Sequence, residues 1–238
     1  RPPTSDLRPH MTERGVVLEG TGGVWRVRTE SGATREASLR GRLKKADMGC
    51  RADGGRARDT VRAAAEMVKL AVGDEVVLER GEQQQGGEEG DGDGASWAIA
   101  EILPRRSQLA RREPGGGHGE RIVAANVDQV VVVFAAAKPE PHPRMLDRFL
   151  VIAEANELEA RVVINKVELV GEGVARERFA DYARAGYPLH LTSTKAGIGL
   201  DELRDALAGR TSVFTGPSGV GKSSLLNALY PGLNLRVG

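Results

Sequence analysis

The chain carries two patterns of apolar and polar positions, one on each side of a glycine-rich stretch near residue 115. Before that stretch, apolar residues come in short runs separated by glycine-containing turns, and Val24–Thr29 alternates apolar and polar side chains. Alternation with a period of two, broken by turn residues, predicts antiparallel strands. The predicted strands cover residues 15–18, 24–29, 33–39, 76–78 and 97–102. Such a series predicts a small all-β barrel, most simply of the OB type.

After residue 120 the apolar runs become longer and alternate with helical patterns. Val130–Ala135 is apolar throughout, as expected for a strand that is covered on both faces. Residues 144–156 follow, with apolar side chains on one broad stripe of a helix. The alternation continues with strands at 161–164, 189–191 and 213–214, and with helices within 174–185 and at 200–207 and 223–229. This order predicts an α/β domain with a parallel sheet and right-handed crossovers.

These patterns, together with composition shifts, predict the domain organisation. The first residues are polar and proline-rich, and we expect them to be disordered. Two stretches within the barrel region contain few strand signals and are interpreted as insertions. The predicted parts are a lead-in at 1–13, a barrel domain at 14–113 with insertions near 52–70 and 81–96, a glycine-rich linker at 114–120 and an α/β domain at 121–238.

Charge is distributed unevenly along the 238 residues, although the net charge is only +1. Residues 1–113 carry 20 Lys and Arg against 19 Asp and Glu, and five of those acids lie in 81–95. Outside that acidic stretch the barrel region is therefore basic, which favours an anionic partner such as nucleic acid. The candidate RNA-binding residues are the clustered cations Arg40, Arg42, Lys44 and Lys45. Because charge runs are often only solvated surface, this cluster is weak evidence by itself.

Composition also narrows the setting in which the protein works. Cys50 is the single cysteine, so an internal disulfide is excluded, and a reducing compartment is favoured. The sequence contains neither an apolar run long enough to span a membrane nor a leader of the secretory type. We therefore expect a soluble, non-secreted and monomeric protein of the bacterial cytoplasm or of an organelle stroma or matrix.

The clearest chemical motif runs from Gly216 to Ser223 and fits the P-loop pattern G-x-x-x-x-G-K-[ST]. A predicted strand leads into it and a predicted helix leaves it, so its backbone N–H groups can surround phosphate oxygens at a helix N-terminus. Lys222 is the predicted catalytic residue, because its ammonium reaches the β- and γ-phosphates, and the Ser223 hydroxyl is the predicted Mg²⁺ ligand. The predicted phosphate-binding residues are Gly216, Pro217, Ser218, Gly219, Val220, Gly221, Lys222, Ser223 and Ser224.

Two further loops follow predicted strands of the same sheet. Asn165-Lys166-Val167-Glu168 resembles the N-K-x-D element of GTPases, and Ser193-Thr194-Lys195 resembles their S-A-K element. A carboxylate at position 168 can accept hydrogen bonds from N1–H and from the 2-amino group of guanine, a match that adenine does not offer. Ligands of α/β sheets bind at the carboxyl ends of the strands, where both loops are expected. The predicted guanine-binding residues are Asn165, Lys166, Glu168, Ser193, Thr194 and Lys195.

The order of these elements identifies a family. In most GTPases the P-loop comes first, whereas here the guanine elements precede it. A β-barrel followed by a permuted GTPase resembles the ribosome small-subunit-dependent GTPase A family of ribosome-assembly factors. The resemblance spans about 14–238 and implies GTP hydrolysis that the 30S subunit stimulates, with the barrel bound to ribosomal RNA. The stretches that carry it are Ala125–Val130, Leu146–Leu150, Ile164–Lys166 and Gly216–Asn227.

Three departures from the family pattern have consequences. Glu168 stands where the family usually has Asp, so the carboxylate is retained one methylene further out. The insertions at 52–70 and 81–96 are longer than the loops of the family's barrels. The chain stops at Gly238, whereas the family continues into switch I, an Asp-x-x-Gly element and a zinc-binding domain. Because Ser212–Phe214 would then form an exposed sheet edge, we expect the natural protein to be longer.

Two other readings remain open at this point. The chain fits a different P-loop enzyme, an ATPase or a nucleotide kinase, if Asn165–Glu168 is merely a strand-to-helix turn. It also fits a non-enzymatic RNA-binding adaptor whose nucleotide domain is only a scaffold. Comparing the affinity for GTP with that for ATP separates the first reading from a GTPase, and RNA binding after loss of Lys222 tests the second.

Overall fold

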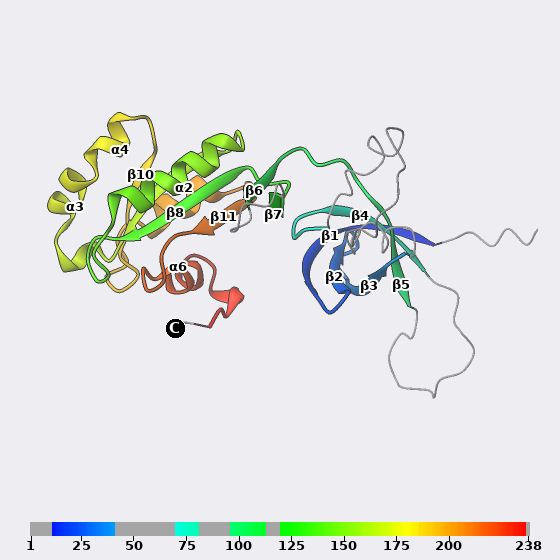
Figure 1. The fold of residues 1–238 in the computed structure, drawn as a ribbon. Coiled ribbons are helices and arrows are strands. Elements are labelled where there is room, and N and C mark those ends of the chain that lie inside the picture. Colours follow the sequence, from blue (N-terminus) through cyan, green and yellow to red (C-terminus); the bar gives the residue numbers. More distant parts are fainter. Residues whose placement is uncertain (1–10, 41–69, 81–95, 113–119, 237–238) are drawn as a thin grey trace, which may run out of the picture. The chain divides into compact units, whose positions relative to one another are not determined.

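The computed structural model describes residues 11–40, 70–80, 96–112 and 120–236 (Figure 1). The chain divides into two compact units, each of which is considered by itself. The first unit comprises Arg1–Arg106 and Ile122–Ala125, and the second comprises Ser107–Arg121 and Asn126–Gly238. None of the described helices has the length and hydrophobicity that crossing a membrane requires.

The first unit contains a closed five-stranded barrel, as the alternating pattern predicts. Its strands follow one another around the barrel in the order β1-β2-β3-β5-β4. β3 and β5 pair in parallel, whereas the other neighbours are antiparallel, and β4 closes the barrel on β1. The strands are β1 (Thr12–Thr21), β2 (Val24–Thr29), β3 (Thr34–Leu39), β4 (Glu75–Arg80) and β5 (Trp97–Ile102).

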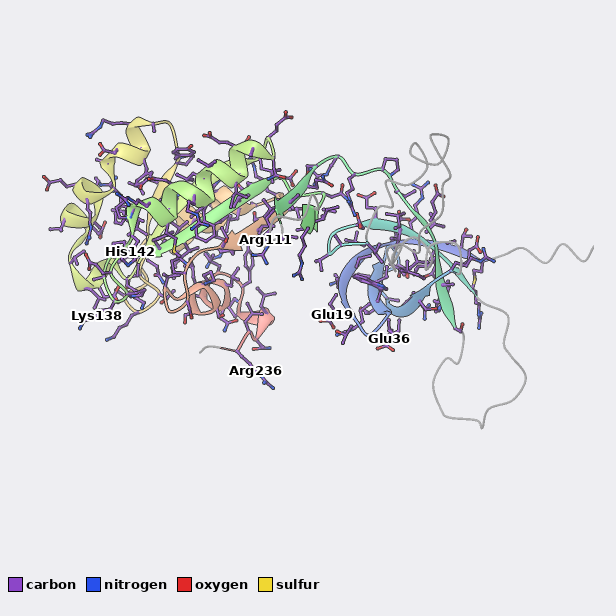
Figure 2. All side chains as sticks on the ribbon, in the orientation of Figure 1. Glu19, Glu36, Arg111, Lys138, His142 and Arg236 are labelled. Atoms are coloured by element: carbon purple, nitrogen blue, oxygen red, sulfur yellow. The ribbon has the colours of Figure 1, made fainter. Side chains whose placement is uncertain are left out.

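Every second residue of these strands faces the barrel interior. Val17, Val27, Leu78 and Ile99 are at most 1% exposed and form its core together with Trp97. The residues between them face outward, as Glu36 does (Figure 2). After Val17 a register shift in β1 interrupts the alternation, and Glu19 is exposed as well. The barrel therefore has a mainly apolar interior and a polar outer face, the arrangement that a period of two produces.

The second unit is built on a four-stranded parallel sheet with the order β10-β9-β8-β11. The central strand β8 is buried over its whole length, which explains its uninterrupted apolar sequence. β11 has β8 as its one strand neighbour among the described residues, so the strand that leads into the P-loop lies at an edge. The strands are β8 (Gln129–Ala135), β9 (Glu159–Asn165), β10 (Leu189–Leu191) and β11 (Ser212–Thr215).

Helices cover both faces of this sheet (Figure 1). On one face the ring of Phe134 meets Phe149 of α2 edge to face, with centroids 6.3 Å apart. On the other face Val131, Val133 and Val163 share a core with leucines of α5 and α6. The helices are α2 (Pro143–Ala155), α3 (Glu172–Arg178), α4 (Ala180–Arg184), α5 (Leu200–Leu207) and α6 (Lys222–Leu229), with 3-10 turns η1 (Val167–Leu169) and η2 (Pro231–Leu233).

This architecture confirms the fold expected from the sequence, and several details differ. The single helix expected within 174–185 is two helices, because the chain leaves helical geometry at the buried Phe179. Strands β6 (Gln108–Arg112) and β7 (Glu120–Ala125) had no predicted counterpart, and they pair with each other. The predicted linker between them lies almost wholly outside the described residues, as do the lead-in and most of both insertions. The domain limits drawn from the sequence therefore stay a prediction.

Candidate functional site

Four loops follow the carboxyl ends of the parallel strands, at one end of the sheet (Figure 1). The P-loop follows β11, the loop with Lys138 follows β8, the Asn165–Glu168 segment follows β9, and the Ser193 loop follows β10. Parallel strands bring these loops together, although they are up to about 80 residues apart in the sequence. The contacts among the loops define a candidate nucleotide site.

Two glycines of the P-loop allow it to approach its neighbours closely. Gly216 has a φ of 140°, and a Cβ atom there would lie 2.1 Å from the carbonyl oxygen of Val133 in β8. Gly221 has a φ of 92°, and its Cβ would lie 2.6 Å from Nδ2 of Asn165. Both positions combine a left-handed backbone with a space that a side chain would fill. The P-loop pattern thus requires glycine at these positions for packing against β8 and β9 as well as for phosphate access.

Lys222 and Ser223 lie in the first turn of α6, where the P-loop ends. The Lys222 ammonium donates hydrogen bonds to the carbonyl oxygens of Gly216 and Pro217, at 2.9 and 2.7 Å. Burial lowers the pKa of this ammonium below its usual value. The half-buried Ser223 hydroxyl makes no hydrogen bond with the part of the chain that the structure describes. A lysine and a free hydroxyl therefore stand side by side at a helix N-terminus.

Asn165 joins the P-loop to the loop after β10. Its side-chain Nδ2 donates to the carbonyl oxygen of Val220 at 3.0 Å, and its Oδ1 accepts from the Thr192 hydroxyl at 3.3 Å. Asn165 is 1% exposed and Thr192 is fully buried. These two bonds fix which way the amide faces and leave one N–H of Nδ2 without an acceptor in the described part of the chain. The side chain thus holds two loops at a set distance and keeps a donor for a third group.

Lys166 makes a second connection across the site. Its ammonium donates to the carbonyl oxygen of Gly219 in the P-loop at 2.7 Å and to that of Lys138 at 2.5 Å. Lys166 has a φ of 62°, a left-handed conformation that turns the chain sharply after β9. The side chain therefore crosses from β9 to both neighbouring loops, and its methylene stem can cover the face of a bound base.

Glu168 and the Ser193 loop lie beside this connection. The Glu168 carboxylate is exposed and has no ion-pair or hydrogen-bond partner among the described residues. Ser193 is fully buried, accepts a hydrogen bond on Oγ from the N–H of Ala196 at 3.0 Å and forms a bridge with Ile198. Thr194 and Lys195 form the turn that this bridge closes, and Lys195 is exposed. The loop is therefore preformed, while the carboxylate beside it is free.

Two residues of this edge were missed by sequence reasoning. Thr192 was passed over because an isolated threonine after a strand carries no motif, although its hydroxyl orients Asn165. Lys138 contributes a backbone carbonyl to Lys166, an interaction that residue type does not reveal. Its side chain is exposed on the loop between β8 and α2, where His142 also lies (Figure 2).

The predicted RNA-binding cluster falls mostly outside the described residues. Arg42, Lys44 and Lys45 lie there, whereas Arg40 follows β3 on the barrel. The Arg40 guanidinium pairs with Glu79 of β4, and its side chain is 59% exposed. The part of the cluster that is described is therefore a surface cation that already has a carboxylate partner.

The fold and the site together define a class of protein. A barrel precedes a parallel sheet on which the segments that resemble guanine elements come before the P-loop, and this is the architecture of a circularly permuted GTPase. A family model described as RsgA GTPase matches residues 102–238, which is more than half of the chain. The chain therefore belongs to the RsgA GTPase family.

Individual relatives support this assignment. The chain is 55% identical over 222 residues to the small ribosomal subunit biogenesis GTPase RsgA of Gemmatimonas aurantiaca, covering 93% of this chain and 64% of that protein. It is 44% identical to the protein of the same name from Azotobacter vinelandii, covering 73% of this chain and 48% of that protein. The chain thus spans about half to two thirds of the length of these relatives.

Solved structures show the same likeness. The structure of YjeQ from Thermotoga maritima aligns with a TM-score of 0.67 and 34% identity, covering 95% of this chain and 68% of that one. YloQ, described as a circularly permuted GTPase, aligns with a TM-score of 0.58 and 28% identity, covering 97% and 68%. Both alignments include the barrel as well as the α/β unit, since they cover nearly all of this chain.

Proposed function

We infer that the protein binds guanine nucleotides at the carboxyl edge of its parallel sheet and hydrolyses GTP. The observation that carries this proposal is the position of Asn165, which bonds to Val220 of the P-loop and to Thr192 of the loop after β10. One amide thereby sets the spacing between a phosphate-binding loop and a base-binding loop. The Glu168 carboxylate, unpaired in the described chain, follows Asn165 by three residues. A carboxylate can accept the two N–H donors that guanine carries at N1 and at its 2-amino group, and adenine has no matching pair.

Each residue of the site has a proposed part in the reaction. The P-loop amides and the Lys222 ammonium stabilise the negative charge that develops on the γ-phosphate as water attacks it. For this the ammonium exchanges the carbonyl oxygens of Gly216 and Pro217 for phosphate oxygens. Lys166 covers one face of the base, and the backbone of Ser193 and Thr194 donates to its O6 atom. Glu168 reads N1–H and the 2-amino group.

Mg²⁺ is the proposed cofactor, and the residues present fit it. The Ser223 hydroxyl is free of protein partners in the described chain and stands next to Lys222 at the start of α6. Hard oxygen ligands of this kind, completed by phosphate oxygens and water, are what Mg²⁺ prefers. When bound, the ion neutralises charge on the β- and γ-phosphates.

The proposed partner is the small ribosomal subunit. The support for this is the name of the curated relatives, small ribosomal subunit biogenesis GTPase, together with the five-stranded barrel that precedes the GTPase fold. Barrels of this type offer a surface for nucleic acid, and Arg40, Arg42, Lys44 and Lys45 are the proposed contacts to ribosomal RNA. The protein would act as a monomer in the compartment where these subunits mature.

Competition titration tests the nucleotide proposal. A fluorescent GDP analogue is bound to the chain and displaced with unlabelled GDP or ADP. We expect GDP to compete at least about a hundredfold better, because ADP leaves the Glu168 carboxylate without its donors. Equal competition by ADP would overturn the proposal in favour of a general P-loop nucleotidase or kinase.

A further inference from the structure

A row of polar side chains crosses the parallel sheet at the amino ends of its strands, away from the nucleotide edge. Gln129 of β8 donates from Nε2 to the Ser212 hydroxyl of β11 at 2.9 Å and accepts from Nε of Arg161 in β9 at 2.6 Å. Arg161 Nη1 lies 3.4 Å from Nε2 of His190 in β10. Nδ1 of His190 faces Glu202 of α5 at 3.4 Å. Every strand of the described sheet contributes one member.

Strand register places this row on a single face of the sheet. Gln129 is level with Ser212 on one side and with Glu159 on the other, and Arg161 follows Glu159 by two residues. His190 is level with Val163, which follows Arg161 by two. Side chains two apart on a strand point to the same face, so the row runs diagonally beneath α5 and α6. Gln129 is fully buried and His190 is 7% exposed.

Arg161 determines which nitrogen of the His190 ring carries the proton. A guanidinium is only a donor, so Nε2 must accept and must carry no proton. The neutral imidazole then has its proton on Nδ1, toward Glu202. If both ring nitrogens were protonated, Nε2 would become a donor that faces a donor, and the side-chain contact between Arg161 and His190 would be lost, while the backbone pairing of β9 with β10 would remain. Burial and the Arg161 charge also act to lower the pKa of His190, whereas Glu202 acts to raise it.

The short strand β10 connects His190 to the loops of the candidate nucleotide site. β10 has three residues, and β9 is its one strand neighbour among those described. His190 is two residues before Thr192, whose hydroxyl orients Asn165. The charged groups that face the imidazole are Arg161 from β9 and Glu202 from α5; α3, which also packs on β10, presents none in the described chain.

We propose that Arg161 and His190 are positioning residues for the loop after β10, residues 192–199, and that protonation of His190 weakens guanine-nucleotide binding. This inference rests on the proposed nucleotide function. The row of polar side chains helps to hold β10 and the loop that follows it. Thr192 in that loop thereby stays within hydrogen-bond distance of Asn165. Protonation removes the side-chain contact between Arg161 and His190. The backbone hydrogen bonds of Thr192 to Ile164 and Val167 remain, so the loop is held less firmly relative to the P-loop but does not detach.

The test measures the dissociation constant of a fluorescent GDP analogue between pH 7.5 and 5.5. The comparison is with His190→Gln, since a glutamine can accept from Arg161 and donate toward Glu202 without titrating. We expect the wild-type affinity to fall by about fivefold more than that of the variant, the equivalent of one hydrogen bond. His10→Gln, which removes an imidazole from the unit that contains the barrel, is the matched control and should keep the wild-type pH profile. Parallel profiles for wild type and His190→Gln would overturn the proposal.

Nuclear magnetic resonance of the wild-type chain decides the matter even if the glutamine variant does not fold. At pH 7.5 the ¹⁵N shifts of His190 should report a proton on Nδ1. As the imidazole titrates, the amide signals of residues 192–199 should move with the same midpoint. Amides that do not respond would overturn the proposal whether or not nucleotide binds. Failure of GDP to outcompete ADP at pH 7.5 would instead count against the nucleotide function alone.

Discussion

The two ends of the parallel sheet use their polar side chains in opposite ways. At the amino ends, Gln129 bonds to Ser212 and to Arg161, and Arg161 in turn lies beside Nε2 of His190. Nδ1 of His190 faces Glu202 at 3.4 Å but makes no hydrogen bond in the described chain. At the carboxyl ends, Glu168 and Ser223 have no partner among the described residues, and Asn165 keeps one free N–H. Buried polar groups are normally paired within the protein. The unpaired N–H of the buried Asn165 side chain therefore indicates where a ligand completes the structure, and the exposed Glu168 carboxylate follows it by three residues.

The largest effect is expected from the residue that is proposed to touch phosphate. Lys222→Ala removes the ammonium that is proposed to reach the β- and γ-phosphates, so GTP hydrolysis should fall by about a hundredfold or more. Single-turnover release of phosphate measures this. Arg184→Ala breaks a surface pair with Asp181 on α4 and should leave hydrolysis unchanged. Undiminished hydrolysis by the Lys222 variant would place the chemistry elsewhere.

A smaller effect is expected where the P-loop packs on Asn165. Gly221→Ala introduces a Cβ that would lie 2.6 Å from Asn165 Nδ2, at a φ of 92°. The strain should lower the free energy of unfolding by about 1–3 kcal/mol and weaken GDP binding. Gly232→Ala is the matched control, because nothing lies within 4 Å of its Cβ and its φ is not left-handed. Chemical unfolding and GDP titration of both variants check the difference, and equal behaviour would mean that this contact is not tight.

Because of His190, in the row of polar side chains at the amino ends of the strands, we expect the free energy of unfolding to depend modestly on pH. Burial is the main cause that lowers the pKa of His190 below its ordinary value of 6.5. The unfolded chain then takes up a proton more readily than the folded one as pH falls. The stabilisation is complete above about pH 6.5 and is lost as pH falls from there toward the folded pKa. Urea unfolding at pH 7.5 and 5.5 should show this loss in wild type and a smaller one in His190→Gln; equal losses would contradict it.

The smallest effect is expected on the barrel surface. Arg40→Ser removes an exposed ion pair with Glu79, and such pairs contribute about 0–1 kcal/mol. Unfolding should therefore hardly change. If the proposed RNA contact is correct, affinity for ribosomal RNA should fall slightly, and more clearly at low salt. A filter-binding titration at two salt concentrations measures this, and a salt-independent affinity would speak against a phosphate contact.

Much of the fold was predictable because its signals are local. Val24–Thr29 and Trp97–Ile102 alternate or carry β-forming residues, and Leu200–Leu207 has a helical stripe, so the elements follow from neighbouring residues. The break at Phe179 was not predictable, since it depends on what that ring packs against. Strands β6 and β7 were missed because they lie on either side of the glycine-rich stretch at 114–120, and the charged residues of β6 hide any alternation of apolar and polar positions.

The site was predictable to the extent that motifs identify it. The P-loop and the Asn165–Glu168 segment carry characteristic spacing, and the structure brings them into contact at Val220. Thr192 and Lys138 contribute through one hydroxyl and one carbonyl, groups that many residues share. Their roles appear only when separate strands are placed side by side. The amino-end row escaped notice for the same reason, because its members come from five separate elements.

The central claim, that the free carboxylate at the carboxyl edge reads guanine, is tested most directly by Glu168→Asn. The substitution replaces an acceptor by a donor, which suits the 2-carbonyl of xanthine instead of the 2-amino group of guanine. Dissociation constants for GDP and XDP are measured for wild type, Glu168→Asn and the conservative Glu168→Asp. Wild type and Glu168→Asp should prefer GDP, and Glu168→Asn should shift its preference toward XDP. An unchanged preference for GDP in Glu168→Asn would show that this residue does not read the base.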